Sequence, residues 1–79
     1  MTAGGTSDER LRQLVSMVLD VPADDVGPGL DFTTLVAWSS LQQMMLASQM
    51  ENAFGVRFTN EQIRGMTTWD RARAMVNGA

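Results

Sequence analysis

Apolar residues recur at helical spacing in the first quarter of the chain, and this spacing most constrains how the chain can fold. Positions i, i+3, i+4, i+7 and i+8 are occupied by Leu11, Leu14, Val15, Val18 and Leu19. A helix places all five side chains on one face. Thr6 and Glu9 form a capping box, T-x-x-E, at the start of this stretch. The helix is predicted to end where Val21 precedes Pro22.

A second helix is predicted from Ser40 to Phe54, with Gly55 as the left-handed residue just past its end. One face of this helix is apolar and consists of Leu46, Ala47, Met50, Ala53 and Phe54. The other side carries a second apolar cluster, Leu41, Met44 and Met45. A helix with one core face does not need a second apolar cluster. The cluster is therefore either an exposed contact surface or packs beneath the preceding loop.

Residues 21–38 show no sustained period and contain Pro22, Gly27, Pro28 and Gly29. Several apolar residues could still pin this long loop to a core, namely Val26, Leu30, Phe32, Leu35 and Val36. A loop of this length is uncommon in so small a domain and is often functional. Its length also allows the two helices that it joins to lie in a non-adjacent or parallel arrangement.

The last third of the chain contains two further helix starts. After a short extended link at residues 56–58, Thr59 and Gln62 form a capping box that opens a brief helix through Arg64. Gly65 stops this helix, and Thr67 or Thr68 caps the next one. The inner face of that last helix carries Trp69, Ala72 and Val76, and Asn77-Gly78 ends it.

These patterns predict an all-α fold, a small bundle of three main helices plus one short helix with a long loop between the first and second helices. Residues 1–5 are expected to form a flexible tail, and residues 6–77 a single domain. A chain of 79 residues allows only one small domain with a thin margin of stability. Without cysteine, the chain has no disulfide to support the domain.

Charge and hydropathy exclude several kinds of partner. The net charge is −3, and the six arginines are scattered rather than clustered into a basic stripe, so no nucleic-acid partner is expected. An acidic group in the first half consists of Asp20, Asp24, Asp25 and Asp31. It suits a positively charged partner or is simply solvated.

No apolar run approaches the roughly 20 residues of a membrane span, and no signal peptide is expected at the start of the sequence. We expect a cytoplasmic protein that binds no membrane.

The residue types that self-contained enzymes use most are missing. The sequence has no His, Cys, Lys or Tyr, so a serine nucleophile would have only carboxylates as bases. We therefore expect neither an enzyme nor a metal site. Ser40, at the start of the second helix, is then either a hydroxyl on which another enzyme acts or an ordinary helix cap.

The motif around Ser40 resembles that of the acyl carrier and peptidyl carrier proteins. Members of that family carry a motif like Gly-x-Asp-Ser-Leu, and residues 37–41 here read Ala-Trp-Ser-Ser-Leu. Leu46, Met50 and Phe54 match the family's inward positions on the second helix. Residues 54–58 match its helix exit, and residues 67–69 open the last helix as in the family. The resemblance covers about residues 7–77.

The resemblance implies a covalent 4'-phosphopantetheine attached at Ser40, with Ser39 as second choice or as the helix cap. It implies modification by a phosphopantetheinyl transferase, and use by an acyl- or aminoacyl-loading enzyme and downstream biosynthetic enzymes. The arm's thiol would then hold a thioester-bound intermediate. We expect the protein to act as a monomer. The expected partner-facing residues are Trp38, Leu41, Met44, Met45 and Ile63. Alternatively, Trp38 is folded into the domain, and Ile63 packs in the core or yields to a sheltered acyl chain.

Three departures from the family motif shape the functional expectation. Ser39 replaces an aspartate thought to help the transferase engage, although a serine caps a helix as well as an aspartate does. Ala37 replaces a glycine, and Trp38 a small residue. Only Glu51 is charged between Ser40 and Phe54, which differs from carriers that serve fatty acid synthesis. We therefore expect a carrier in polyketide or nonribosomal peptide biosynthesis. The alternative is a carrier-like interaction scaffold that has lost its arm.

Overall fold

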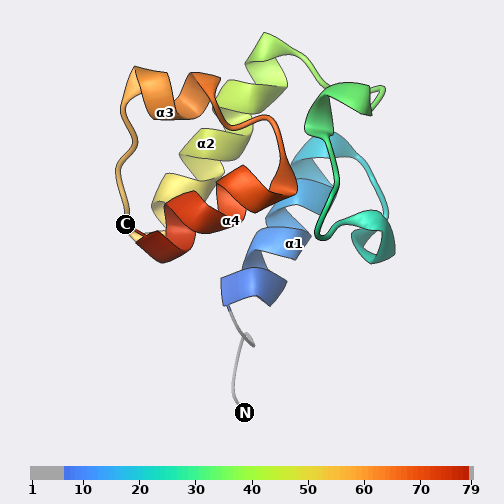
Figure 1. Cartoon of the computed structure of the whole chain (residues 1–79), viewed down its shortest axis with the longest axis horizontal. Helices are drawn as coiled ribbons and strands as arrows, with labels where there is room; N and C mark the ends of the chain where they lie inside the picture. Colours follow the sequence, from blue (N-terminus) through green and yellow to red (C-terminus); the bar gives the residue numbers. More distant parts are fainter. Residues whose placement is uncertain (1–6, 79) are drawn as a thin grey trace.

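Four α-helices make up most of residues 7–78, the part of the chain that the computed structural model describes (Figure 1). In chain order they are α1 (Ser7–Leu19), α2 (Ser40–Phe54), α3 (Asn60–Arg64) and α4 (Trp69–Gly78). Two 3₁₀ turns, η1 (Ala23–Asp25) and η2 (Phe32–Thr34), interrupt the loop between α1 and α2. The described residues contain no β-strand, only one isolated bridge between Asp31 and Thr68. The predicted all-α bundle of three main helices and one short helix is confirmed.

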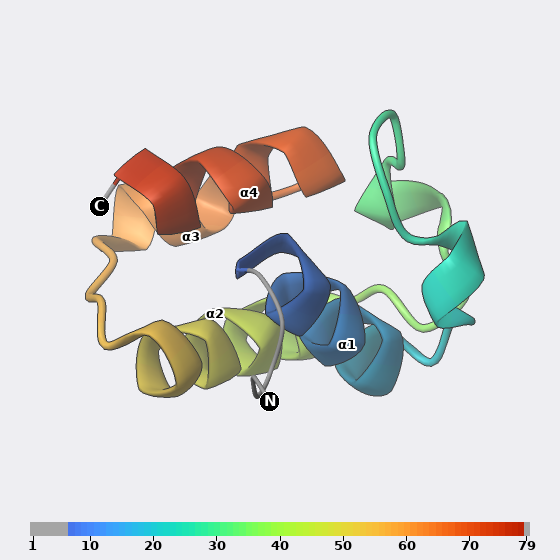
Figure 2. The same ribbon diagram turned by 90° about the horizontal axis from the view of Figure 1, so that it is seen from below.

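The helices form two layers, with α1 and α2 in one and α3 and α4 in the other (Figure 2). At one end of the first layer, the Gln42 side-chain amide donates to the Val18 carbonyl at 2.8 Å. At the other end, the Arg10 guanidinium donates to the Ala53 carbonyl at 2.6 Å. Helices α1 and α2 are therefore adjacent and antiparallel. The expectation of a non-adjacent or parallel arrangement is wrong, because the long loop folds onto the start of α4 instead of crossing the bundle.

The core lies between the two layers and draws side chains from every main helix and from the loop. Its fully buried members of largest volume are Trp69, Phe32, Leu11, Leu19, Leu46, Met50, Met66 and Val15. No polar or charged residue is buried among the residues described. Burial of each large apolar side chain stabilises the fold by about 1.5–3 kcal/mol. The predicted inward faces of α1, α2 and α4 are confirmed by the burial of Val15, Leu46 and Ala72.

The loop between α1 and α2 is held against the start of α4 by backbone hydrogen bonds. The Phe32 N–H donates to the Thr67 carbonyl at 2.9 Å, and the Trp69 N–H donates to the Leu30 carbonyl at 3.0 Å. The Gly29 N–H donates to the Asp70 carboxylate at 3.1 Å. These bonds connect residues about 40 positions apart in the sequence. They fix the course of the loop before it reaches α2.

Four of the five apolar loop residues contact the core as predicted, and the fifth does not. Val26 and Phe32 are buried, and Leu30 and Leu35 pack against the core half-buried. Val36 is fully exposed, so its expected role as an anchor is wrong. Its neighbour Leu35 already faces inward at the end of η2. The next residue therefore points to solvent.

Most of the predicted helix boundaries are confirmed. Gly55 ends α2 in the left-handed region, with φ of 68°. Thr59 and Gln62 form the complete capping box of α3. At the start of α4, Thr68 rather than Thr67 accepts the cap hydrogen bond, from the Arg71 N–H at 3.2 Å.

The predicted start of α1 cannot be compared with the structure, whereas its predicted end can. Thr6, one half of the expected first capping box, and the expected tail at residues 1–5 lie outside the described residues. The helix ends at Leu19, short of the predicted Val21, because Asp20 adopts a left-handed conformation with φ of 53°. The Val21 N–H then donates back to the Ser16 carbonyl at 3.2 Å, which closes the last turn. No helix within residues 7–78 is long and apolar enough to cross a membrane.

Acid is expected to remove the stabilisation that Asp31 provides at the start of η2. The Thr33 hydroxyl and then the Thr33 N–H donate to this carboxylate, and these hydrogen bonds lower the pKa of Asp31 below its ordinary value of 3.8. A lowered folded-state pKa stabilises the fold above pH 3.8, and this contribution disappears as the pH falls through the lower value. We predict that Asp31→Asn lowers the melting temperature at pH 7 and that the difference from wild type shrinks as the pH falls below 3.8.

Thermal melts followed by circular dichroism from pH 7 to pH 2 test this prediction. Asp24→Asn, an exposed carboxylate in η1, is the matched control. A difference for Asp31→Asn that is as large at pH 2 as at pH 7 contradicts the prediction.

Candidate functional site

Ser39 occupies the N-cap position of α2 and uses its hydroxyl there. Its backbone is extended, with φ of −162° and ψ of 169°. The Gln42 N–H donates to the Ser39 Oγ at 3.2 Å, and the Gln43 N–H donates to the Ser39 carbonyl at 2.9 Å. The first bond satisfies an N–H that the first turn of a helix leaves without a partner, and the second is the first regular backbone bond of α2. Ser39 therefore caps the helix, as one of the two sequence-based readings of this residue predicts.

Ser40 is the first residue of α2, and its side chain is exposed. Its hydroxyl makes no hydrogen bond to any other residue in the described part of the chain. The first turn of a helix also carries a partial positive charge from its aligned peptide dipoles. A negative group attached to this hydroxyl would lie in a favourable field. The structure thus presents one hydroxyl engaged in capping and, one residue later, one that is free.

A cleft of about 420 Å³ opens beside Ser40, between the first turn of α2 and helix α3. Its lining residues are Ser40, Gln43, Met44, Asn60, Ile63 and Arg64. The Gln43 side-chain amide donates to the Ile63 carbonyl at 2.6 Å and to the Arg64 carbonyl at 3.1 Å. Neither carbonyl has a partner within α3 itself, although the Ile63 carbonyl also accepts the Met66 N–H at 3.1 Å. The two Gln43 bonds hold α3 against α2 and so define one wall of the cleft.

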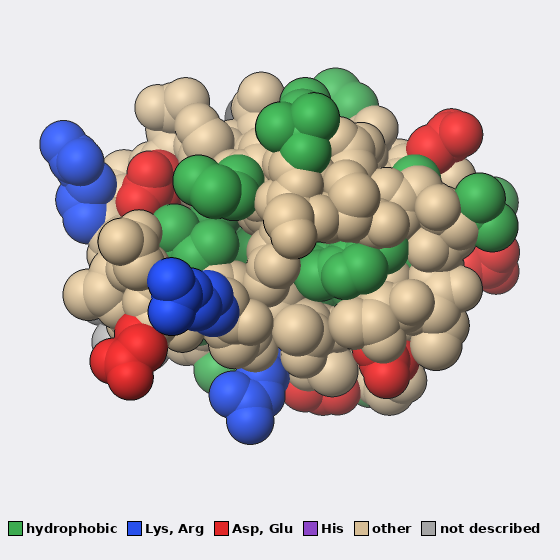
Figure 3. Space-filling model, turned by 90° about the horizontal axis from the view of Figure 1, so that it is seen from above, with side chains coloured by type: hydrophobic (Ala, Val, Ile, Leu, Met, Phe, Trp, Pro, Cys, Tyr) green, Lys and Arg blue, Asp and Glu red, His purple; other side chains and the backbone are tan. Residues whose placement is uncertain are grey.

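Three apolar side chains that follow Ser40 are exposed. Leu41, Met44 and Met45 expose 68%, 58% and 44% of their surface. This exposure contradicts the alternative that they pack beneath the long loop. Figure 3 shows the face that contains the start of α2, on which hydrophobic side chains gather while charged side chains lie mostly toward its margins. Such a surface has the composition of a contact surface.

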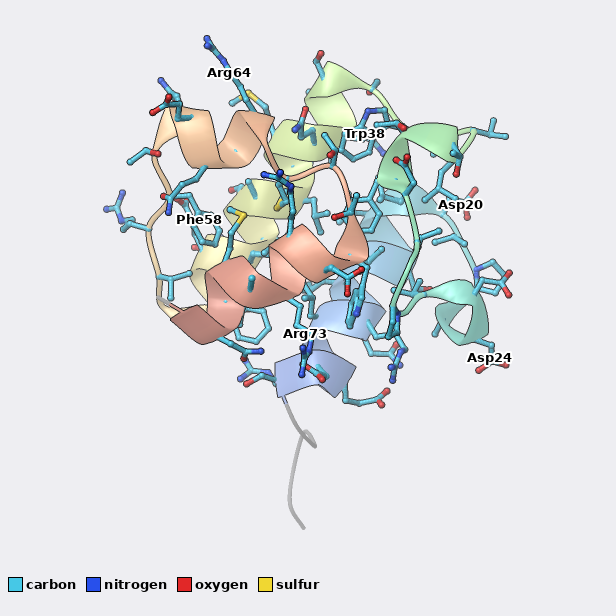
Figure 4. The ribbon with its side chains drawn as sticks, in the orientation of Figure 1. Asp20, Asp24, Trp38, Phe58, Arg64 and Arg73 are labelled. Atoms are coloured by element: carbon cyan, nitrogen blue, oxygen red, sulfur yellow. The ribbon has the colours of Figure 1, made fainter. Side chains whose placement is uncertain are left out.

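Trp38 and Ile63, the other two residues expected to face partners, are half-buried. The Trp38 ring lies 5.8 Å from the Phe32 ring, centre to centre, and packs against the core next to the start of α2 (Figure 4). Ile63 also packs against the core and lines the cleft with its remaining surface. Partner contact by either residue stays a prediction, and the packing of Trp38 agrees with the alternative that it is folded into the domain.

Sequence reasoning missed the structural role of two consecutive glutamines. Gln42 and Gln43 lie on the neutral side of α2, yet neither is fully exposed to solvent. Each is half-buried, and they donate hydrogen bonds to the ends of α1 and α3 respectively. A signal existed in their spacing, since they stand four and three residues before buried Leu46 and so flank the core face of α2. Asn60 and Arg64 also line the cleft, and no local pattern in the sequence marks either as a site residue.

Comparison with known protein families shows to which family the chain belongs. The chain matches the family described as phosphopantetheine attachment site over residues 9–76. It therefore belongs to this family of phosphopantetheine-binding carrier domains, and the resemblance seen in the sequence is confirmed. Domains of this family are sites of covalent 4'-phosphopantetheine attachment. No curated protein sequence matches the chain.

The residues at the start of α2 fit this group. A phosphodiester requires a free, accessible hydroxyl, which Ser40 has, and a helix N-terminus favours its negative charge. The arm beyond the phosphate contains amides and methyl groups. The adjoining cleft offers matching surfaces in the Asn60 side chain and in Met44 and Ile63. The exposed hydroxyl, the helix N-terminus and the adjoining cleft are thus compatible with the group.

Proposed function

We propose that Ser40 is the attachment residue for 4'-phosphopantetheine and that the protein serves as an acyl or peptidyl carrier. The observation that carries this proposal is the contrast between the two adjacent hydroxyls. The Ser39 Oγ accepts the Gln42 N–H, whereas the Ser40 Oγ is exposed and free of hydrogen bonds within residues 7–78. Membership of the carrier family supports the cofactor, and this contrast supports the residue.

Loading requires chemistry that this chain does not supply. The Ser40 Oγ attacks a phosphorus atom of the coenzyme A pyrophosphate, and an O–P bond forms as adenosine bisphosphate leaves. A base on the phosphopantetheinyl transferase takes the serine proton, because the sequence contains no His, Lys or Cys to do so. The attached arm supplies a terminal thiol that holds an acyl or aminoacyl group as a thioester. This division of labour agrees with a carrier that is not itself an enzyme.

Leu41, Met44 and Met45 are proposed to contact the enzymes that load and use the carrier. They follow the attachment residue directly and are exposed. Methionine is flexible and polarisable, which suits a surface that meets several partners in turn. Because Glu51 is the only charge on α2, we propose polyketide or nonribosomal peptide enzymes, acting in the cytoplasm on a monomeric carrier. Preferential turnover by fatty acid synthase enzymes would contradict this choice of pathway.

Incubation with coenzyme A and a broad-specificity transferase tests the carrier function. The intact mass is expected to rise by one phosphopantetheine, and fragment mass spectrometry is expected to place the added group on Ser40 rather than Ser39. The second candidate function is an arm-less interaction scaffold, favoured by Ser39 where the family motif has an aspartate. An unchanged mass with several different transferases supports that scaffold.

Leu41→Ala is expected to slow acyl transfer by partner enzymes without unfolding the domain. Leu41 is the most exposed of the three apolar side chains next to Ser40, and truncation of a contact residue commonly costs about 1–2 kcal/mol of binding, or roughly 5- to 30-fold. Steady-state transfer assays with the loaded carrier measure this change. Ser48→Ala, an exposed position farther along α2, is the control. Equal kinetics for Leu41→Ala and Ser48→Ala refute the proposed contact.

A further inference from the structure

The cleft beside Ser40 differs in charge from the rest of the molecule. The sequence carries a net charge of −3. Among the six residues that line the cleft, Arg64 is charged and none is acidic. Ser40, Gln43 and Asn60 supply neutral polar groups, and Met44 and Ile63 supply the apolar walls. The side chains that line the cleft beside the Ser40 hydroxyl therefore carry a net positive charge, whereas the whole chain is acidic.

The Arg64 guanidinium is not used to hold the fold together. Other arginines have structural partners: Arg10 donates to the Ala53 carbonyl, Arg12 pairs with Glu9, and Arg73 pairs with Asp8. The Arg64 side chain is exposed and has no hydrogen bond or ion pair with any residue in 7–78. Figure 4 shows it extending outward from α3 rather than into the core. Its charge is thus available to a group outside the folded chain.

The backbone of Arg64 is fixed although its side chain is free. The Gln43 side-chain amide binds the Arg64 carbonyl, and the Gly65 N–H donates to the Glu61 carbonyl at 3.1 Å. The long Arg64 side chain therefore extends from a backbone position that is held on the wall of the cleft. Arg57 also makes no hydrogen bond or ion pair with its side chain within residues 7–78, but it lies on the link before α3 and does not line the cleft.

We propose that Arg64 binds a negative group on the chain attached to Ser40. This inference rests on the proposed attachment of phosphopantetheine at Ser40. Two sources share the chemistry: the phosphodiester next to the serine, and the terminal carboxylate of a dicarboxylic acyl cargo. The planar guanidinium can donate two parallel hydrogen bonds to either one. Met44 and Ile63 cover the apolar part of the attached chain, so Arg64 decides which charged group the cleft retains.

The test compares three loaded forms of the intact protein. Coenzyme A, butyryl-coenzyme A and succinyl-coenzyme A are each transferred to wild-type protein, and mass spectrometry confirms the addition at Ser40. Butyryl and succinyl groups have four carbons each and differ in the terminal carboxylate. The measurement is the rate at which the arginine Nε–H groups exchange with water, resolved by nuclear magnetic resonance. Bound guanidinium groups exchange more slowly than free ones.

Exchange at Arg64 is expected to slow by roughly two- to fivefold relative to the unloaded protein, the size expected of a partly exposed charge pair. The rate at Arg57 is expected to stay unchanged. Slowing in all three forms identifies the phosphodiester as the source, and slowing in the succinyl form alone identifies the cargo carboxylate. Either effect should weaken at 0.5 M salt, because salt screens exposed charge pairs, with a screening length of about 8 Å at physiological ionic strength.

Paired variants check that the effect belongs to Arg64. Loading also shifts the backbone amide resonances of the cleft, and Arg64→Gln is expected to reduce these shifts by at least about twofold, whereas Arg57→Gln leaves them as in wild type. Protein loaded at Ser40 whose Arg64 exchanges as in the unloaded form overturns this inference alone. Protein that no transferase loads at Ser40 overturns the proposed function and this inference together.

Discussion

Ser40→Ala is expected to abolish the gain of one phosphopantetheine in intact mass completely. The substitution removes the exposed hydroxyl at the start of α2. The neighbouring Ser39 hydroxyl does not replace it, because its oxygen accepts the Gln42 N–H and it precedes the helix. Alanine is also the best helix former, so the substitution should leave α2 intact. Circular dichroism should therefore match that of wild type while loading falls below detection.

Two serine variants separate attachment from capping. Ser48→Ala removes an exposed hydroxyl from the middle of α2 and is expected to load as wild type does. Ser39→Ala is expected to lower the free energy of unfolding by about 1 kcal/mol through loss of the cap, yet still to load at Ser40. Modification of Ser40→Ala at Ser39 would show that the attachment residue has been assigned to the wrong hydroxyl.

Phe32→Ala is expected to destabilise the domain by about 3–5 kcal/mol, the usual result of emptying a large buried aromatic site. Phe32 is fully buried although it belongs to the loop, and its ring contacts the Trp38 ring. Native domains are stable by only about 5–15 kcal/mol in total. A domain this small lies toward the lower end of that range, so much of the protein should be unfolded at 37 °C. Urea denaturation followed by tryptophan fluorescence measures the loss.

Val36→Ala is the matched control for the loop. Val36 is an apolar residue of the same loop, but its side chain is fully exposed, so we expect a change within about 0.5 kcal/mol. Comparable destabilisation by Phe32→Ala and Val36→Ala would mean that the loop is not anchored by its buried aromatic residue. The comparison also tests whether the loop contributes to the core as strongly as the helices do.

Local patterns in the sequence are sufficient to predict the helices. The apolar stripe from Leu11 to Leu19 and the residues Gly55 and Thr59 each specify a face or an end through contacts with near neighbours. The course of the loop could not be predicted in the same way. Its position depends on bonds such as that from Gly29 to Asp70, which lie 41 residues apart. Hydrophobic periodicity and secondary-structure propensity carry no information about contacts between residues so far apart in the sequence.

The candidate site also has a part that local sequence patterns predict and a part that depends on long-range packing. The Ser-Leu pair in its helical register predicts Ser40 as the attachment residue, and the preference of serine for the N-cap predicts the capping role that Ser39 has in the structure. The cleft could not be predicted, because it forms only where α3 meets α2. Gln43 binds carbonyls 20 and 21 residues away, and Arg64 reaches the cleft only because of that packing. Contacts between residues so far apart do not follow from local patterns in the sequence.

Gln42 and Gln43 have a consequence for the mechanical stability of the first turn of α2, where the arm is proposed to be attached. Through these adjacent residues the first turn of α2 is fastened to the last turns of both α1 and α3. Helix ends ordinarily fray, and an arm drawn into a partner's active site would pull on the weakest part of its helix. Here a force applied at Ser40 is shared by α2 and, through the two glutamine hydrogen bonds, by α1 and α3. An arm attached at Ser40, as proposed, would therefore pull on a helix start that is hydrogen-bonded to two other helices.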